Sequence, residues 1–150
     1  MSNKEQFYLT KLEWLGPILV RGLRLLSSVE ALGQEFSFSQ MMILMTLLRL
    51  HQTSMNQLAR TLGLSRANAS GLVDRLVNKG LIARVRSETD RRVVLVQLTT
   101  EGQRVAQYLT QQNRQGLRRM MRRIPDHQLR TFVETLEQLA RGLAEGTVEE

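Results

Sequence analysis

The sequence predicts a mainly α-helical domain that carries one small β-hairpin. Apolar residues recur with the 3.6-residue period of a helix along most of the chain, which has only two prolines. After Gly80 the period changes to two residues, which is typical of strands. A chain of 150 residues suits one domain, and this length buries roughly 70% of the unfolded surface without help from disulfides.

The first helix is predicted by leucines three or four positions apart, at Leu12, Leu15, Leu19, Leu23 and Leu26. Pro17 lies within this stripe. Because proline lacks an amide donor and crowds the preceding turn, we expect Pro17 to bend the helix or to mark its effective start. A second helix is expected to begin near Ser39 and to run to about Leu48.

Two further helices are expected on either side of a glycine turn. Ser54 is a suitable N-cap for a short third helix, which ends at Gly63. Ser65 is a suitable N-cap for the fourth helix, which Gly80 stops. Ala59 is small, as the close packing of two helices around such a turn requires.

Residues 81–86 and 93–98 alternate with the period of strands and predict a hairpin. The hexapeptide between them, residues 87–92, has nothing to bury and lacks Asn-Gly or Asp-Gly. We therefore expect a loop longer than two residues that projects from the domain. Helix, glycine turn, helix and hairpin in this order describe a winged helix-turn-helix.

Two helices complete the chain. Thr100 and Gln103 fit a capping box, which predicts a long helix over about residues 101–124. The last helix is expected to begin at Pro125 and Asp126. Its apolar face is predicted to consist of Leu129, Phe132, Val133, Leu136, Leu139, Ala140 and Leu143.

The composition excludes several classes of function. The chain has no cysteine, which removes disulfides, thiolate zinc sites and thiol-based redox sensing. Its longest apolar run, residues 41–48, is too short to span a membrane, and no signal region is visible, so we expect a cytoplasmic protein. His51 and His127 have no partners at ligand spacing, and no catalytic constellation is present. We expect no metal, no cofactor and no enzymatic activity.

The positive charge is concentrated in the middle of the chain. The net charge is +7, and residues 52–98 contribute +5 of it. Such a surface favours a polyanionic partner. In the fourth helix, small and hydrogen-bonding residues lie opposite the apolar face, which suits a helix that enters the major groove of DNA. The alternative is an ordinary amphipathic helix with a solvated polar face.

Residues 72–102 carry a specific motif in four parts: Asp74-Arg75-Leu76, Lys79-Gly80-Leu81-Ile82, Asp90-x-Arg92 and Leu98-Thr99-x-x-Gly102. In this order and spacing the motif resembles the MarR family of bacterial transcriptional regulators, and the flanking helices match the family's six-helix plan. The resemblance implies a homodimer whose first and last two helices interlock, so that two winged lobes straddle double-stranded DNA. It also implies a repressor released by a small ligand, with phenolic compounds as one class of candidate.

The resemblance places Arg92 at the wing arginine that enters the minor groove, with Arg91 as a phosphate contact. We expect residues 37–100 to form the DNA-binding lobe and residues 1–36 and 101–150 to form the dimerisation region. The expected DNA-binding residues of the fourth helix are Ser65, Arg66, Ala67, Asn68, Ser70, Gly71 and Arg75. Those of the wing are Arg86, Asp90, Arg91 and Arg92, with further phosphate contacts from Ser54 and Lys79. The expected dimerisation residues are Leu12, Leu15, Leu19, Phe132, Leu136 and Leu139.

Some interpretations stay open at this stage. A nonspecific, nucleoid-type protein that binds nucleic acid through charge alone is the main alternative to a sequence-specific regulator. We expect Asp90 to pair with Arg75 or Arg92 and so to hold the wing against the fourth helix. A final group of arginines suits a solvated helix end, a membrane surface or an auxiliary DNA contact: Arg118, Arg119, Arg122 and Arg123.

Overall fold

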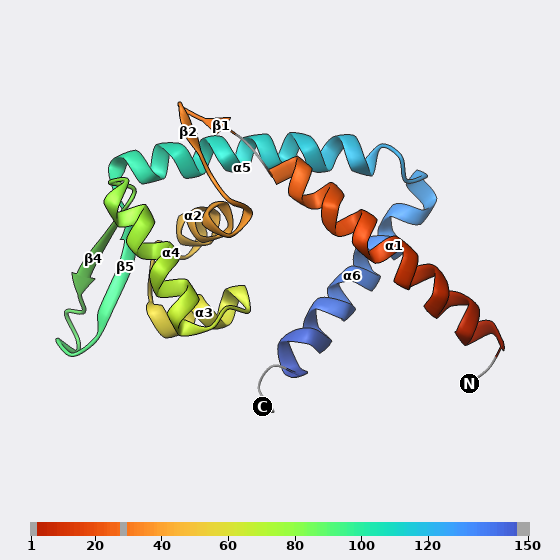
Figure 1. The fold of residues 1–150 in the computed structure, drawn as a ribbon, viewed down its shortest axis with the longest axis horizontal. Coiled ribbons are helices and arrows are strands. Elements are labelled where there is room, and N and C mark those ends of the chain that lie inside the picture. Colours follow the sequence, from red (N-terminus) through yellow and green to blue (C-terminus); the bar gives the residue numbers. More distant parts are fainter. Residues whose placement is uncertain (1–2, 28–29, 147–150) are drawn as a thin grey trace.

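The computed structural model describes residues 3–27 and 30–146, with side chains for residues 4–22 and 32–142. It confirms the mainly α-helical fold of six helices with a hairpin wing (Figure 1). In chain order the elements are α1 (Asn3–Ser27), β1 (Glu30–Ala31), β2 (Gln34–Glu35), α2 (Phe38–Leu50), β3 (Gln52–Ser54), α3 (Met55–Leu62), α4 (Arg66–Asn78), β4 (Ile82–Arg86), β5 (Val94–Leu98), α5 (Thr100–Met121) and α6 (Asp126–Gly146).

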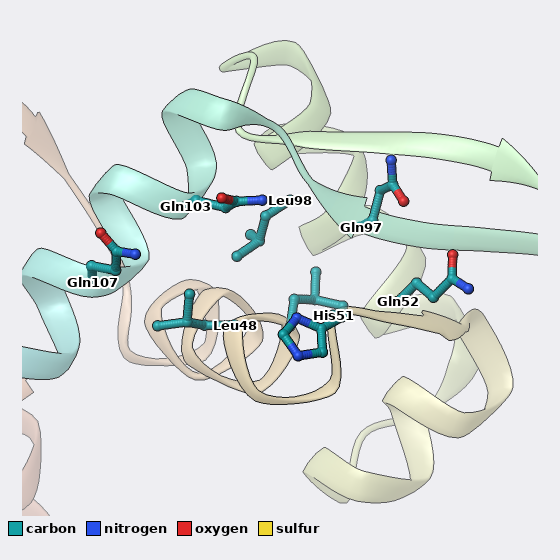
Figure 2. Close-up of a pocket in the computed structure, with 8 residues that line it drawn as sticks. Leu48, His51, Gln52, Gln97, Leu98, Gln103 and Gln107 are labelled. Carbon is teal, nitrogen blue, oxygen red and sulfur yellow. The ribbon is translucent and has the colours of Figure 1, made fainter.

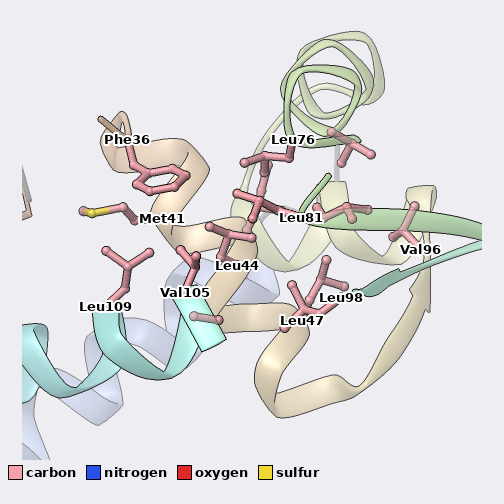
Figure 3. Close-up of a cluster of buried hydrophobic side chains, with 14 of the residues drawn as sticks. Phe36, Met41, Leu44, Leu47, Leu76, Leu81, Val96, Leu98, Val105 and Leu109 are labelled. Atoms are coloured by element: carbon pink, nitrogen blue, oxygen red, sulfur yellow. The ribbon is translucent and has the colours of Figure 1, made fainter. Parts of the chain in front are cut away.

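One hydrophobic core holds the winged lobe together, and α2 lies at its centre (Figure 3). Ile43, Leu44 and Leu47 of α2 are fully buried. They pack with buried residues of α3, α4 and the hairpin, and with Val105 and Leu109 from the first half of α5. Each such side chain stabilises the fold by roughly 1.5–3 kcal/mol relative to exposure. The start of α5 is therefore fixed to the lobe.

The lobe contains an antiparallel sheet of three strands in the order β3-β5-β4. The sequence predicts β4 and β5, and their register pairs Ile82 with Leu98 and Arg86 with Val94. It does not predict β3, which has only three residues, nor the two-residue pair β1 and β2. Strands this short carry too few alternating residues to show a period.

Two helix starts differ from the sequence prediction. The first helix begins at Asn3 and continues through Pro17, so Pro17 does not mark its start. The second begins at Phe38 rather than near Ser39, because Ser37 is the N-cap. The Ser37 hydroxyl accepts from the Gln40 amide, and the Gln40 side chain accepts from the Ser37 amide, which completes a capping box.

The start of α5 is a tightly built joint. The predicted capping box of Thr100 and Gln103 is wrong by one residue: the N-cap is Thr99, whose hydroxyl accepts from the Gly102 amide at 3.0 Å. The same hydroxyl donates to the Gly80 carbonyl at 2.7 Å, and the Thr99 amide donates to the Leu81 carbonyl at 3.0 Å. A Cβ on Gly102 would overlap the Leu81 carbonyl group, so only glycine permits this close approach.

The molecule has two unlike ends. The lobe lies at the start of α5, whereas α1 and α6 extend from its far half, away from the wing (Figure 1). The apolar side chains of α1 and α6 are largely exposed in the single chain, as for Leu12 at 63% and Leu139 at 59%. No helix in the described ranges is both long enough and apolar enough to cross a membrane.

Candidate nucleic-acid interface

The pair of helices α3 and α4 is held by caps that the sequence predicts. The Ser54 hydroxyl accepts from the Gln57 amide, and the Ser65 hydroxyl accepts from the Asn68 amide, each at 3.2 Å. Between the helices, Gly63 adopts φ +61°, a left-handed conformation that residues with a Cβ rarely adopt. This turn fixes the direction in which α4 leaves α3.

Helix α4 presents one face to the core and the other to solvent. Ala69, Val73 and Leu76 are fully buried. The outer face is small, polar or basic, and Ser70 is half-buried at its margin. Its exposed residues are Arg66, Ala67, Asn68, Gly71, Asp74, Arg75 and Asn78. Ala67 and Gly71 add little bulk to this face, so another molecule can approach the helix backbone closely beside them.

The wing tip is a turn closed by hydrogen bonds. The Ser87 amide donates to the Val93 carbonyl at 2.9 Å, which closes the loop beyond the two strands. Within the loop, the Asp90 carboxylate accepts from the backbone amide of Arg92 at 3.0 Å. Arg91 and Arg92 are exposed. Asp90 therefore shapes the tip that carries the two arginines, while their guanidinium groups remain in solvent.

The expected pairing of Asp90 with Arg75 or Arg92 side chains is wrong. The ion pair that joins the wing to α4 is formed instead by Asp74 and Arg84, whose oxygen and nitrogen lie 2.6 Å apart. Arg84 is on β4, where its side chain is directed to α4, whereas Asp90 lies beyond the strands at the loop tip. The only signal for this contact in the sequence is that Asp74, on a predicted helix, precedes Arg84, on the next predicted strand, by ten residues.

Asp74→Asn should loosen the wing without unfolding the lobe. Both side chains of the pair are partly exposed, at 36% and 54%, so its contribution is about 0.5–1 kcal/mol. Hydrogen exchange at the Ser87 and Val93 amides should accelerate roughly two- to fivefold, while the α2 amides stay protected. Glu101→Gln is the matched control, because it removes the pair with Arg104 instead. Unchanged exchange at both wing amides would show that the sheet alone holds the wing.

The structure brings the wing and the start of α4 to one side of the lobe. Both the hairpin tip and the α3–α4 turn lie at the edge away from α5 (Figure 1). Exposed arginines at positions 66, 75, 86, 91 and 92 therefore belong to a surface made by two elements. None of them forms an ion pair with another described residue. Exposed guanidinium groups without an acidic partner can bind phosphate oxygens with paired hydrogen bonds.

The two other expected phosphate contacts each form a hydrogen bond within the chain. The Ser54 hydroxyl caps α3, although its own proton remains available. The Lys79 ammonium donates to the Glu35 carbonyl at 3.0 Å and lies 4.8 Å from the centre of the Phe36 ring. Lys79 thus ties the end of α4 to the segment before α2.

The expected dimerisation residues are at the other end of the molecule. Leu12, Leu15 and Leu19 are exposed on α1, and Phe132, Leu136 and Leu139 are exposed on α6. The side chains of Leu23, Leu26 and Leu143 lie outside the described residues. Three aromatic residues, Phe7, Tyr8 and Trp14, add to the exposed apolar surface of α1. The arginines at 118, 119, 122 and 123 are exposed at the end of α5 that is remote from the wing (Figure 1).

Comparison with known proteins agrees with this architecture. Residues 35–93 match the model of the MarR family. The HTH-type transcriptional regulator YfiV of Bacillus subtilis is 32% identical over 109 residues, which cover 73% of this chain and 68% of YfiV.

Solved structures share the fold. Sco3205 of Streptomyces coelicolor, a MarR family transcriptional regulator solved in complex with DNA, superposes with a TM-score of 0.78 at 21% identity, covering 95% of this chain and 89% of that chain. PcaV of the same organism, a transcriptional regulator solved with its natural ligand, gives 0.71 at 24% identity, covering 85% of this chain and 89% of that chain. The sequence match and the shared fold lead to one conclusion: this chain belongs to the MarR family.

Proposed function

We propose that this protein is a sequence-specific regulator of transcription that binds double-stranded DNA. The observation that carries the proposal is the shared surface of α4 and the wing tip. A helix with a small, polar outer face fits the major groove, and an arginine on a projecting hairpin fits the adjacent minor groove. The regulatory name of YfiV and the DNA complex of Sco3205 support the same assignment. The role is regulatory rather than enzymatic.

Within this surface we assign different tasks to different residues. Asn68, Ser70 and Arg75 offer side-chain hydrogen bonds to base edges, whereas Ala67 and Gly71 let the helix approach closely. Ser65, Arg66 and Arg86 contribute to the fit or the charge around this face, and the Ser54 hydroxyl can still donate its proton to a phosphate. Lys79 is given no phosphate contact, because the Glu35 carbonyl and the Phe36 ring hold its ammonium group at the other end of α4. Arg92 enters the minor groove, where the negative potential is concentrated, and Arg91 contacts phosphate. Asp90 holds the backbone that presents Arg92.

The proposed active form is a homodimer. The apolar area exposed on α1 and α6 is larger than a stable monomer usually leaves in water. A second copy of the chain would bury it in a symmetric interface. We propose that residues 1–36 and 101–150 mediate this contact, with the first half of α5 shared with the lobe of residues 37–100 because Val105 and Leu109 are in its core. Two-fold symmetry requires a pseudo-palindromic operator with half-sites about one helical turn, ~10 bp, apart.

We extend the proposal to repression that a small ligand relieves. PcaV, which shares this fold, was solved with its natural ligand, and phenolic compounds are one class to test here. The protein would act on the nucleoid in the cytoplasm. Selecting bound fragments from the source genome would identify both the operator and the neighbouring genes, whose products indicate the ligand.

Two single substitutions separate reading of sequence from attraction by charge. Arg92→Ala should weaken binding to many duplexes alike and reduce the slope of log affinity against log salt by roughly one phosphate equivalent per half-site. Asn68→Ala should cost ~1–3 kcal/mol on the selected operator and almost nothing on scrambled DNA. Fluorescence anisotropy across a salt series measures both effects.

Arg141→Ala is the control, since it removes the same charge from an exposed position on α6. It should leave the salt slope nearly unchanged. If Asn68→Ala weakened operator and scrambled duplexes equally, α4 would not read sequence at this position, and the nonspecific nucleic-acid-binding alternative would replace the regulator proposal. Wild-type affinity of Arg92→Ala at every salt concentration would remove the wing from the interface.

A further inference from the structure

A cavity of about 400 Å³ lies on the lobe between the end of α2, the β3–β5 edge of the sheet and the first turns of α5 (Figure 2). This volume is within the range of small-molecule sites in proteins, roughly 300–1,000 Å³. Its lining residues are Leu47, Leu48, His51, Gln52, Gln97, Leu98, Gln103 and Gln107. None of them belongs to the DNA-facing surface or to the apolar stripes of α1 and α6.

The lining combines an apolar floor with an uncharged polar rim. Leu47 and Leu98 are buried in the core and Leu48 is half-buried, which gives the cavity a fixed base. The rim consists of four primary amides and one imidazole, and no acidic residue, lysine or arginine lines the cavity. A charged ligand would meet no counter-charge from an acidic residue, lysine or arginine here, so the lining favours a neutral one.

The four glutamines come from three elements and all line this cavity. Gln52 and Gln97 face each other in the β3–β5 register, and Gln103 and Gln107 are one turn apart on the same side of α5 (Figure 2). No described residue forms a hydrogen bond with any of these four side-chain amides. Each group therefore has two donors and an acceptor available for a ligand.

The backbone conformation of His51 is a second, independent indication that this cavity is a binding site. It ends α2 with φ +64° and ψ −57°, although it is not a glycine, and its amide donates to the Leu47 carbonyl at 2.9 Å. Among the described residues other than glycine, Leu32 alone shares a positive φ. Backbone strain of this kind costs roughly 1–3 kcal/mol and persists mainly where a site requires it. Here the strain places the imidazole at the mouth of the cavity (Figure 2).

We propose that this cavity binds a neutral, planar ligand that presents adjacent hydrogen-bond donors and acceptors along its edge, as a nucleobase or a cyclic amide does. A primary amide pairs with such an edge through two parallel hydrogen bonds, which is how glutamine recognises adenine. The apolar floor of Leu47, Leu48 and Leu98 covers one face of the ring. The site does not depend on the DNA-binding proposal, because neither its residues nor its test involves DNA.

The test uses uracil and adenine as probes, with resonance shifts of the protein followed by two-dimensional NMR. Both probes should produce saturable shifts in the side-chain amides of the four glutamines and in the backbone at residues 51–52 and 97–98. Two matched compounds should bind at least about fivefold more weakly: 1,3-dimethyluracil, which lacks the N–H donors, and uracil-6-carboxylate, which is charged. Each ligand hydrogen bond lost costs roughly a two- to tenfold change in affinity.

Gln107→Ala should therefore weaken uracil binding by about two- to tenfold, and Gln52→Ala with Gln107→Ala should weaken it further. Gln111→Ala is the control, since Gln111 is one turn further along α5, exposed, and outside the lining. Well-dispersed spectra of each variant would establish that it is folded. The proposal is overturned if neither probe gives saturable shifts, if 1,3-dimethyluracil binds as tightly as uracil, or if Gln107→Ala binds like Gln111→Ala.

Discussion

Gly102→Ala is expected to lower the free energy of unfolding by about 3 kcal/mol or more. The new Cβ would overlap the carbonyl oxygen of Leu81 and lie 2.9 Å from its carbonyl carbon. These are backbone atoms of the joint between α4 and the hairpin, so they cannot turn aside as a flexible side chain would. Relief requires the start of α5 to move outward, which opens the core around Val105.

The control is Gly71→Ala, also within a helix, where an added Cβ meets nothing within 4 Å. It should stabilise the protein by roughly 0.5–1 kcal/mol, because alanine favours a helix more than glycine does. Urea unfolding and thermal melts without DNA measure both variants, and we expect the melting temperature of Gly102→Ala to fall by about 6–12 °C. A wild-type melting temperature for Gly102→Ala would mean that α5 does not pack against Leu81 this closely.

Replacing Leu136 and Leu139 together by aspartate should separate the proposed dimer. Both residues are exposed in the single chain, at 48% and 59%, so the substitutions bury no charge within one protomer. In the dimer they would bury uncompensated carboxylates, each at a cost of several kcal/mol. Because about 1.4 kcal/mol is a factor of ten, dissociation should be at least roughly a thousandfold more favourable.

Sedimentation equilibrium of the variant and the wild type measures this shift. Thr131→Asp with Gln138→Asp is the control, because it adds the same charge to α6 outside the apolar stripe. The control should remain dimeric. The double leucine variant should be monomeric or unfolded and should lose tight operator binding. A well-folded monomer that still bound the operator tightly would contradict the homodimer proposal.

The helices and the hairpin were predictable because their signals are local. Serine caps at Ser54 and Ser65, a glycine at position 63 and the change of period after Gly80 each act within a few residues of chain. The start of α5 was not predictable to the residue, because two threonines stand side by side. Thr99 rather than Thr100 is the N-cap because of a contact that is distant in sequence: the Thr99 hydroxyl also donates to the Gly80 carbonyl. β3 was not predicted for a similar reason, because its three residues form a strand through pairing with the distant β5.

The candidate nucleic-acid interface was likewise predictable only where the signal is local. Which face of α4 is exposed followed from its periodicity. The partner of Asp74 did not, because the choice between Arg84 and other bases depends on how the hairpin lies against the helix. That Gln52, Gln97, Gln103 and Gln107 line one cavity could likewise not be predicted, since glutamines scattered over three elements form no pattern in the sequence.

The joint at Thr99 also has a mechanical consequence. Hydrogen bonds from Thr99 to Gly80 and Leu81, and the contact of Gly102 with Leu81, fasten the end of α4 to the start of α5. Helix α5 has 22 residues and is therefore about 33 Å long, a rigid lever with α1 and α6 at one end and the lobe at the other. A rotation of only ~5° at the far end would sweep the lobe through about 3 Å. In the proposed homodimer, a change in the angle between the two copies of α5 would thus alter the distance between the two proposed DNA-binding surfaces without deforming either lobe.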